Sequence, residues 1–515
     1  MDSFIKIAGV AVAATVLLII GNAIRQLLPR SKSEPPAVFH WIPIVGNAIS
    51  YGMDPPTFFR QNREKYGDIF SFTLFNMKLM CYFGIDGNEF ILNGKVADLN
   101  AEEVYGPLTV PVFGKDVIYD CPNAKLMQQK KFVKFALTQQ ALEGAVPIIE
   151  KEVTDYIKTT PGLKGQAGTL DISKAMAEVN IFTASRAIQG EEIRSRLSRD
   201  YAKVYNDLDN GLQPVNFLMP WFPFPHNRKR DLAHIHMRNL YLEVIEKRRK
   251  QGPEAEHDMI WNLLNCKYKD GTPVPDKEIA HMMITMLLGG QHSSSSSSSW
   301  MLLHIASRPE VGKALYQEQV DNLSKDGKLQ PLTYADLDKL PLLKNVVRET
   351  LRTHSSIHSV MRKVTRTLEV PGTPYVLHPG TVMLSSPLVT QLSDEHFPNA
   401  AEWNPSRWES KEEKKVEGDG EKEAAKEEEE ESDLTLAKGA RSAYLPFGAG
   451  RHRCIGEKFA YLNLEVIVAT FVRHFHLSNV DGSREVPPTD YSSLFSRPTM
   501  PAVIRWERRV PDEKA

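Results

Sequence analysis

The chain has 515 residues, a formal net charge of −1 and four cysteines. The length exceeds that of an ordinary single hydrophobic core, and the near-neutral charge gives no reason to expect a nucleic-acid partner. The cysteines show no paired spacing, no C-x-x-C and no zinc-binding pattern; they are Cys81, Cys121, Cys266 and Cys454. This excludes a disulfide-stabilised scaffold and a zinc finger, and it indicates a reducing compartment where one cysteine is available for a cofactor.

The first predicted element is an apolar segment long enough to cross a bilayer. Ile7 to Ile24 covers 18 residues with two polar interruptions, about the length of a membrane-spanning helix. Positive charges follow at once, at Arg25, Arg30 and Lys32, which places the C-terminal side in the cytosol. A cleaved signal peptide is the competing interpretation, but no small-residue cleavage site follows the long run. We expect residues 1–30 to be a retained single-pass anchor and residues 31–515 to be a cytosolic catalytic domain.

A second apolar segment, Ile279 to Ala306, contains seven consecutive serines from Ser293 to Ser299. A serine run is typical of linkers, but helix-forming apolar residues flank this one without a proline. The segment therefore predicts one long buried helix. Gly289 and Gly290 leave room on it for a flat ligand, and serine hydroxyls that bond to the preceding turn would loosen the helix locally into a groove.

The segment from Glu409 to Asp433 is too charged to join a hydrophobic core. It carries 13 acidic and 5 basic residues, a net charge of −8, so the remainder of the chain carries +7. Such a run buries too little apolar surface to order itself. We expect residues 409–438 to be a disordered acidic insertion on a basic body, and a solvated segment without function is the simplest interpretation.

The most informative segment is the loop from Tyr444 to Ile467, which contains Cys454. Three glycines lie in it, Gly448, Gly450 and Gly456, and an apolar helical stretch begins at Glu457. The glycines allow backbone to approach a flat ligand, while the helix start and the neighbouring cations Arg451, His452 and Arg453 favour a thiolate. A thiolate is the axial ligand with which haem iron cleaves dioxygen.

The spacing F-x-x-G-x-basic-x-C-x-G, met here by Phe447, Gly450, His452, Cys454 and Gly456, resembles the cysteine loop of the cytochrome P-450 haem-thiolate monooxygenases. One departure is visible, since the family's usual arginine is His452. The resemblance implies a mainly α fold with small β-sheets in one large domain. It also implies haem b with Cys454 as the axial ligand of the iron, and electrons from NADPH through a reductase.

Two further strings match this family. Glu349-Thr-Leu-Arg352 is an E-x-x-R pair, and Arg407 follows it in a W-N-P-S-R-W string. The resemblance implies that these three residues form a buried ion cluster that supports the haem, and breaking such a cluster costs about 3–5 kcal/mol. The family also has a small-Gly-x-acidic-Thr notch where oxygen binds. Here His292 and Ser293 stand for the acid and the threonine, and both can still relay protons as catalytic residues.

Longer strings resemble the fungal sterol 14-alpha-demethylase branch of the family: Tyr105 to Asn123, Gln129 to Phe132, Ser356 to Val364 and Asp490 to Phe495. The resemblance covers essentially the whole chain after the anchor. It implies three oxidations that remove the 14-alpha-methyl group of lanosterol or eburicol as formate, in ergosterol biosynthesis. It also implies binding of azole inhibitors and an endoplasmic reticulum location in a monomeric protein.

The same resemblance assigns roles to individual residues. Those expected to hold the haem and its propionates are Cys454, Tyr119, Lys130, Arg362 and His452. Those expected to line the sterol pocket are Tyr105, Phe113, Tyr119, Phe217, Gly289, His292, His358, Leu494 and Phe495. A basic face for an acidic reductase is expected at Lys125, Lys131, Lys134, Arg451 and Lys458. Taken singly, such aromatic residues are more often core, and such lysines are more often ordinary surface charge.

Two other functions remain open at this point. A broad-range monooxygenase of the same fold would keep the cysteine loop but have a more plastic pocket, and the strings around Tyr119 and Arg362 count against it. A thiolate-haem isomerase, or a haem-binding protein without oxygen turnover, would need neither a notch nor a reductase face. The substituted notch at His292 and Ser293 keeps that second class under consideration.

Overall fold

The structure is a computed structural model that describes residues 2–134, 137–197, 201–213, 215–252, 258–409 and 439–509. It is mainly helical with small sheets, as expected, and its contacts separate two compact units. Unit 1 comprises residues 1–104, 358–398 and 427–452; unit 2 comprises residues 105–357, 399–426 and 453–515. The predicted acidic insertion lies outside the described residues except for Glu409.

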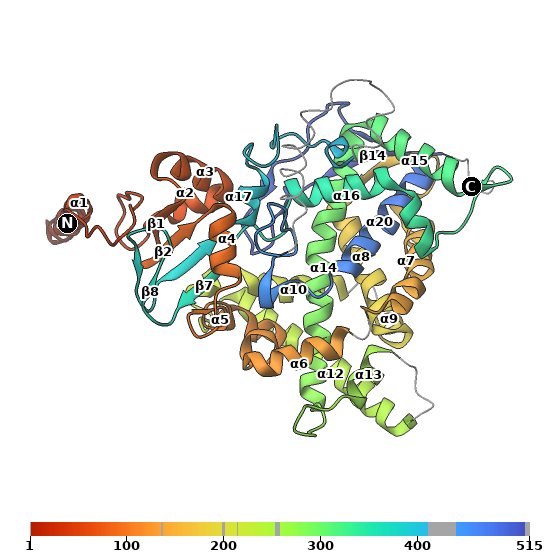
Figure 1. The fold of residues 1–515 in the computed structure, drawn as a ribbon, viewed down its shortest axis with the longest axis horizontal. Coiled ribbons are helices and arrows are strands. Elements are labelled where there is room, and N and C mark those ends of the chain that lie inside the picture. The colour runs from red at the N-terminus through yellow and green to blue at the C-terminus, as the bar shows by residue number, and fades with distance from the viewer. Residues whose placement is uncertain are drawn as a thin grey trace. The chain divides into compact units, whose positions relative to one another are not determined.

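Unit 1 is built around a five-stranded sheet of order β1-β2-β10-β7-β3 (Figure 1). Its strands are β1 (Ile69–Leu74), β2 (Met77–Tyr82), β3 (Leu99–Asn100), β7 (Val360–Val364) and β10 (Val382–Ser385), with a separate hairpin of β8 (Leu368–Glu369) and β9 (Val376–Leu377). Its helices are α1 (Asp2–Leu27), α2 (Ala48–Met53), α3 (Pro55–Tyr66), α4 (Gly84–Leu92) and α17 (Pro387–Gln391).

The pairing in this sheet follows from the chain between the strands. β1 and β2 form an antiparallel hairpin that pairs Leu74 with Met77. Its two turn residues, Phe75 and Asn76, have φ of 46° and 65°, the left-handed geometry that two-residue hairpins need. β10 then lies parallel to β2 and antiparallel to β7. The aromatic core against this sheet is formed by Phe58, Phe59, Phe70, Phe72 and Phe83.

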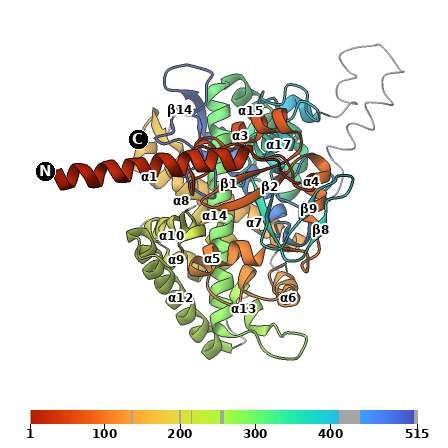
Figure 2. The same ribbon diagram turned by 90° about the vertical axis from the view of Figure 1, so that its left-hand side faces the viewer.

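Helix α1, seen at full length in Figure 2, contains the predicted anchor. Its last turns are tied to the following segment, because Asn22 Nδ2 donates to His40 O at 2.9 Å and Gln26 Nε2 donates to the same oxygen at 2.8 Å. Asn22 and Gln26 thus form a hydrogen-bonded joint between the last turns of α1 and His40. Among the residues whose side chains the structure describes, no helix is long and apolar enough to span a membrane. Several side chains of the predicted span, including that of Ala11, lie outside the described set.

Unit 2 holds the remaining helices. They are α5 (Glu102–Phe113, its first turn in unit 1), α6 (Asn123–Lys134), α7 (Gln139–Thr159), α8 (Ile172–Ala184), α9 (Glu191–Arg196), α10 (Tyr201–Asp209), α11 (Val215–Leu218), α12 (Pro225–Gln251), α13 (Met259–Asn265), α14 (Asp276–Ser307), α15 (Pro309–Leu323), α16 (Pro341–Thr353) and α20 (Glu457–His474). Proline at the first position starts α12, α15 and α16, where its missing N–H is not needed.

The strands of unit 2 form small sheets at the edge of the helices. β11 (Phe475–Asn479), β14 (Val503–Arg508) and β4 (Ala167–Asp171) make a three-stranded antiparallel sheet. β12 (Thr489–Asp490) pairs with β13 (Arg497–Pro498), and β5 (Ser324–Lys325) pairs with β6 (Lys328–Leu329). The β12–β13 hairpin matters for the site, because the predicted pocket residues Leu494 and Phe495 lie in its loop.

Helix α14 organises unit 2 and runs through its helices in both views, with α8 packed along it (Figures 1 and 2). Its serine run is helical, as the apolar flanks predicted, and Ser294 to Ser299 are buried. Some of the hydroxyls find partners within the helix: Ser295 donates to Gln291 O at 2.6 Å and Ser298 to Ser294 O at 2.7 Å. Back-bonding satisfies these buried hydroxyls, and the helix continues through the run without the predicted loosening.

Candidate functional site

Cys454 lies between a short turn of 3-10 helix, η9 (Gly450–His452), and the first turn of α20. The residue is exposed on one side. The protein packed around its other sides raises the pKa of the thiol by burial, and the Gly456 N–H and the Lys130 cation offset part of that rise. Arg453 offers less help, because Nη2 is paired with Glu457 at 2.8 Å. The loop alone therefore favours the thiol, contrary to the sequence-based expectation, and a bound metal cation would have to stabilise the thiolate.

Two glycines of the loop serve its backbone path. Gly448 and Gly450 have φ of 66° and 67°, a region that costs other residues free energy. A Cβ on Gly450 would lie 2.2 Å from Leu92 O, so this glycine allows close packing against the end of α4. A Cβ on Gly456 would lie 3.9 Å from the Cys454 sulfur. We predicted glycines that admit a ligand, and for Gly450 the close neighbour is protein backbone instead.

Unit 1 contributes a basic cluster next to the cysteine loop in sequence. Arg451 donates to Gly94 O and to Leu99 O, both at 2.8 Å, so it braces the loop, and its place on a reductase-docking face stays a prediction. His452 Nε2 lies 3.6 Å from Glu102 Oε1, beyond hydrogen-bond range. Burial lowers the pKa of His452 even though Glu102 opposes this. Burial alone would raise the pKa of Glu102, but His452 and nearby dipoles lower it to about 2.

Arg362 is the other basic residue of unit 1 that was predicted to hold a haem propionate. It lies in β7, is 3% exposed, and its Nη1 donates to Met361 O at 2.7 Å. In the described part of the chain, no carboxylate lies within 4.0 Å of its guanidinium. A buried cation without an anion is costly, so the position suits an acidic group of a ligand.

Unit 2 contributes Tyr119 and Lys130 to the predicted propionate set. Lys130 Nζ donates to Arg453 O at 3.2 Å, which places it beside the cysteine loop. Burial lowers the pKa of Lys130, and Cys454 partly opposes the shift. Tyr119, in the 3-10 helix η1 (Ile118–Asp120), stacks obliquely on Tyr105 with ring centroids 5.0 Å apart. Whether Tyr119 and Lys130 hold the same group as Arg362 and His452 stays a prediction.

The predicted aromatic pocket residues of unit 2 form two groups. Tyr105 contacts Tyr119 and also Phe217, at 6.2 Å between centroids. Phe495 stacks on the His292 ring at 5.7 Å and 17°. Leu494 is partly buried, and Phe113 is 8% exposed at the end of α5.

The segment that carries Phe495 is held in place by serine hydrogen bonds. Ser296 on α14 donates to Ser496 O at 2.8 Å, and Ser496 donates in turn to Ser355 O at 2.6 Å. Ser356 donates to Ser293 O at 3.2 Å. The serine run thus connects α14 to two neighbouring segments, and the contact to Ser496 O gives a second reason for the hydroxyl of Ser296.

The notch predicted on α14 is open at its glycines. A Cβ built on Gly289 or Gly290 meets nothing within 4 Å. Ser293 Oγ donates to Gly289 O at 2.8 Å. His292 faces Asp209 at the end of α10, with Nε2 and Oδ1 3.3 Å apart, and neither atom makes a hydrogen bond within the described residues. Burial lowers the pKa of His292, although Asp209 opposes the shift.

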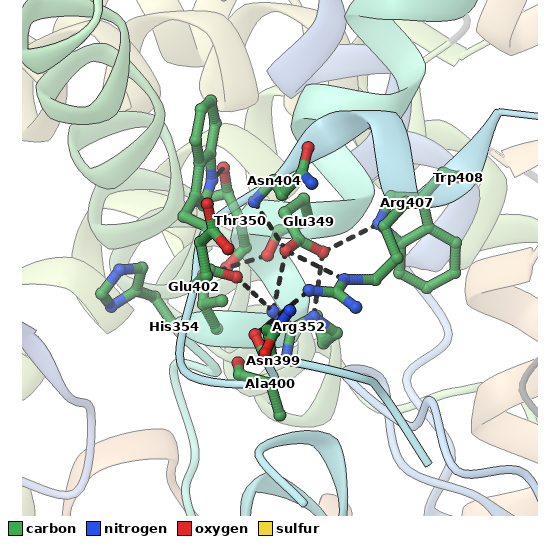
Figure 3. Close-up of polar contacts among 12 residues, drawn as sticks. Glu349, Thr350, Arg352, His354, Asn399, Ala400, Glu402, Asn404, Arg407 and Trp408 are labelled. Carbon is green, nitrogen blue, oxygen red and sulfur yellow. Dashed lines mark hydrogen bonds and ion pairs between the residues drawn. The ribbon is translucent and has the colours of Figure 1, made fainter. Parts of the chain in front are cut away.

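The predicted ion cluster on α16 is assembled in full within unit 2 (Figure 3). Arg352 Nε and Nη2 donate to the two Glu349 oxygens at 2.9 and 2.7 Å, and both side chains are 0% exposed. Arg407 Nε reaches Glu349 at 3.4 Å, and Trp408 Nε1 donates to it at 2.9 Å. Burial alone would raise the pKa of Glu349, but the bonds and charge of Arg352 outweigh it and lower that pKa.

The remaining predictions have mixed outcomes. His358 lies in unit 1, where Ser386 Oγ donates to its carbonyl at 2.5 Å and burial lowers the pKa of its ring to about 4. Lys125 is paired with Glu278 at 2.8 Å, which weakens its case as a docking cation. Lys131, Lys134 and Lys458 are exposed.

Two acidic residues of the site were missed by the sequence reasoning, Asp209 and Glu102. Asp209 lies 83 positions before His292, and Glu102 lies 350 positions before His452. No local pattern connects partners so far apart, so the signal for either pairing exists only in the folded chain.

Comparison with known proteins gives a consistent picture. The family model described as cytochrome P450 matches residues 36–506, a range that includes both units. A sterol 14-alpha demethylase of Aspergillus flavus is 58% identical over 100% of this chain and 99% of its own. One of Aspergillus fumigatus is 59% identical over 97% and 96%, and an eburicol 14-alpha-demethylase of Penicillium italicum is 54% identical over 98% of both.

A solved structure, the retinoic acid-bound cyanobacterial CYP120A1, has the same fold. Its TM-score is 0.74 with 18% identity, covering 93% of this chain and 100% of that one. At this identity the likeness concerns the fold alone.

Proposed function

Because the chain belongs to the cytochrome P450 family, we propose that it is a sterol 14-alpha-demethylase. It oxidises the 14-alpha-methyl group of lanosterol or eburicol three times and releases it as formate, with dioxygen and with electrons from NADPH through a reductase. The observation that carries this proposal is the identity of 53–59% to curated sterol and eburicol 14-alpha demethylases over nearly the full length.

Each unit, taken by itself, supplies groups that fit a haem. Cys454 has an exposed side for the iron, and the buried Arg362 guanidinium needs an anion such as a propionate. Tyr119 and Lys130 supply a hydroxyl and a cation for the other propionate. His452 fits less well than expected, because it faces Glu102. When bound, thiolate-ligated haem supplies the activation of dioxygen that C–H oxidation needs.

The chain itself moves the protons. Asp209 and His292 face each other across 3.3 Å without a hydrogen bond, so the imidazole can turn from the carboxylate toward the notch at little cost. Ser293 is one residue further along α14, and its hydroxyl must leave Gly289 O to receive a proton. The path runs from Asp209 to His292, and then through water and Ser293 to the oxygen site.

The pocket walls suit a rigid apolar substrate. Tyr105, Tyr119 and Phe217 form one aromatic group, and Phe495 lies over His292. Aromatic faces bury the flat rings of a sterol with few polar contacts. The stacking of Phe495 on His292 supports a substrate wall that lies against the proton path, so that bound sterol excludes bulk water from this path.

The proposed location rests on helix α1 of unit 1, and the proposed reductase contact rests on exposed lysines of unit 2. α1 is a single-pass anchor in the endoplasmic reticulum membrane, and the joint made by Asn22 and Gln26 fixes how it leaves unit 1. The reductase docks on unit 2 through the exposed cations Lys131, Lys134 and Lys458. The protein acts as a monomer.

One experiment tests the proposal. The purified protein, with haem, NADPH and a fungal reductase, is given lanosterol or eburicol, and the demethylated sterol and formate are measured. The reduced protein with carbon monoxide should show the red-shifted band of thiolate ligation, and Cys454→Ala should lose both the band and the turnover. Product formation from neither sterol, with an intact carbon monoxide band, would contradict the proposal.

A further inference from the structure

Two histidines from different helices meet at the turn that ends α5. His234 of α12 has its Nδ1 3.0 Å from Val112 O, and His281 of α14 has its Nδ1 2.9 Å from Lys115 O. A carbonyl only accepts, so both Nδ1 atoms must carry the proton. The last carbonyls of a helix lack partners within the helix. His234 therefore caps the end of α5 from outside, and His281 holds the turn that follows, so that this end of α5 is tied to α12 and α14.

The packing around the turn leaves little freedom. The two rings lie 5.4 Å apart, and a Cβ on Gly114 would lie 2.4 Å from the His281 ring. Gly114 also has φ of 100°, so this position needs glycine for both its conformation and its contact. Phe113, the predicted pocket wall, lies between the two carbonyls that the histidines hold, and it is 8% exposed.

The charges around the pair favour neutral imidazoles. Burial lowers the pKa of both rings, and each also feels the cation of Arg238 on α12. Asp231 acts against this shift at His234, and Asp116 and Glu278 act against it at His281, but they do not reverse it. His281 Nε2 is buried and has no hydrogen-bond partner within the described residues. A second proton on that ring would find no acceptor there.

We infer that His234 and His281 are positioning residues that hold the 112–115 turn and thereby set the Phe113 wall of the sterol pocket. The inference rests on the proposed function for the identity of the pocket. By this inference, the two histidines contribute to the binding of a bulky, rigid substrate. They do not contribute to the binding of a small ligand that needs only the iron. Neither histidine touches the substrate in this arrangement; each acts through the backbone on Phe113.

The test compares variants that keep or remove the donor at the Nδ1 position. His281→Asn and His234→Asn retain an N–H close to that position, whereas His281→Gln and His234→Gln place it near Nε2, and the leucine variants remove it. His236→Leu is the matched control, because His236 is also on α12 but its Nε2 lies 3.3 Å from Tyr201 OH rather than beside a carbonyl of the 112–115 turn. Lanosterol and imidazole are titrated into each haem-loaded protein, and amide hydrogen exchange is followed over residues 112–119.

Each leucine or glutamine variant should weaken lanosterol binding about fivefold, since a buried carbonyl is left without its donor. Imidazole affinity should not change, the asparagine variants should bind lanosterol like wild type, and exchange in the turn should be faster only where the donor is lost. In wild type, lanosterol affinity should fall as the pH is lowered from 7 to 5. The two asparagine variants should lose less lanosterol affinity over this range, because asparagine does not titrate.

Lanosterol affinity that is equal in the asparagine and glutamine variants, with unchanged exchange in the turn, would overturn the inference. Should the leucine variants fail to load haem, the asparagine–glutamine comparison decides alone. A wild-type protein that binds imidazole but no sterol would instead contradict the proposed function, and the exchange data would still decide whether the histidines hold the turn.

Discussion

Two buried acid–base arrangements in unit 2 differ in how well their charges are satisfied. Glu349 accepts from Arg352, Arg407 and Trp408, and Arg352 also donates to Ala400 O at 2.7 Å (Figure 3). The pair of His292 and Asp209 has a single contact of 3.3 Å and no hydrogen bond between the facing atoms within the described residues.

This difference distinguishes an ion cluster that holds the structure in place from a pair of groups that can transfer protons. A carboxylate whose lone pairs are filled by fixed donors cannot exchange partners without a large loss of free energy, so it stabilises one geometry. A buried carboxylate and an imidazole that are close but unbonded retain the ability to change partner, which proton transfer requires. The same chemical groups thus serve as a brace near α16 and as a relay between α10 and α14.

Breaking the brace should give the largest effect. Arg352→Leu leaves the Glu349 carboxylate buried without its bidentate partner and should lower the free energy of unfolding by about 3–5 kcal/mol. Thermal unfolding of the haem-free and haem-loaded proteins measures this. Arg484→Leu is the control, because its pair with Glu310 is exposed and should contribute about 0–1 kcal/mol. Equal losses in the two variants would mean that the cluster is not a brace.

Breaking the relay should slow turnover without unfolding the protein. Asp209→Asn and His292→Leu should each reduce the rate of sterol oxidation about 10²-fold, and Asp209→Asn, which changes no predicted pocket residue, should leave lanosterol binding and the carbon monoxide spectrum as in wild type. His474→Gln serves as control, since His474 is also partly buried with a lowered pKa but its Nδ1 bonds Thr470 O of its own helix at 2.9 Å. Full activity in Asp209→Asn would remove that residue from the relay.

The two arrangements also show what the sequence can and cannot specify. Glu349 and Arg352 are one helical turn apart, and Arg407 lies in a recognisable string, so the brace was predictable. The serine run was predicted as helix from its apolar flanks, because helix formation there depends on local pattern. Asp209, Glu102 and the two histidines that hold the 112–115 turn depend on long-range packing, which no local spacing encodes. The raised pKa of the Cys454 thiol was missed for a related reason, since burial in the folded chain outweighs the neighbouring cations Lys130 and Arg453.

A pH series should sharpen the comparison, because the two sites lose function in different windows. The pKa of His292 is lowered from 6.5 by burial, so the unfolded chain binds that proton more readily and stability from this site falls as pH drops below about 6.5. The pKa of Glu349 is lowered from 4.5, so its contribution is present above about pH 4.5 and is lost as pH falls through the folded value.

Asp209→Asn removes the group that opposes the shift at His292, and it should move the acidic limb of the rate profile to lower pH. Glu349→Gln should remove the acid-dependent loss of stability below pH 4.5 and leave that limb where it is. The measurements are the rate of sterol oxidation and the midpoint of thermal unfolding across pH 4–8. An acidic limb that stays in place in Asp209→Asn would show that another group sets it.

The smallest effect is expected from the acidic charge of the predicted insertion, which lies outside the described residues. Residues 410–432 carry 11 acidic and 5 basic residues and lie in the chain between Trp408 and the cysteine loop. An acidic reductase is repelled by this charge during encounter, so deleting the segment should leave the reductase-driven rate equal or faster at low salt. The gain should fade as salt rises, because the Debye length falls from about 30 Å at 0.01 M to about 8 Å at 0.15 M. Haem content and lanosterol affinity should not change, since loop-closure entropy varies slowly with length.

A variant in which these residues are retained but their acids are changed to Gln and Asn separates charge from length. If the deletion abolishes haem binding while the neutralised variant retains it, the segment contributes to the fold and the predicted boundary of the insertion is wrong.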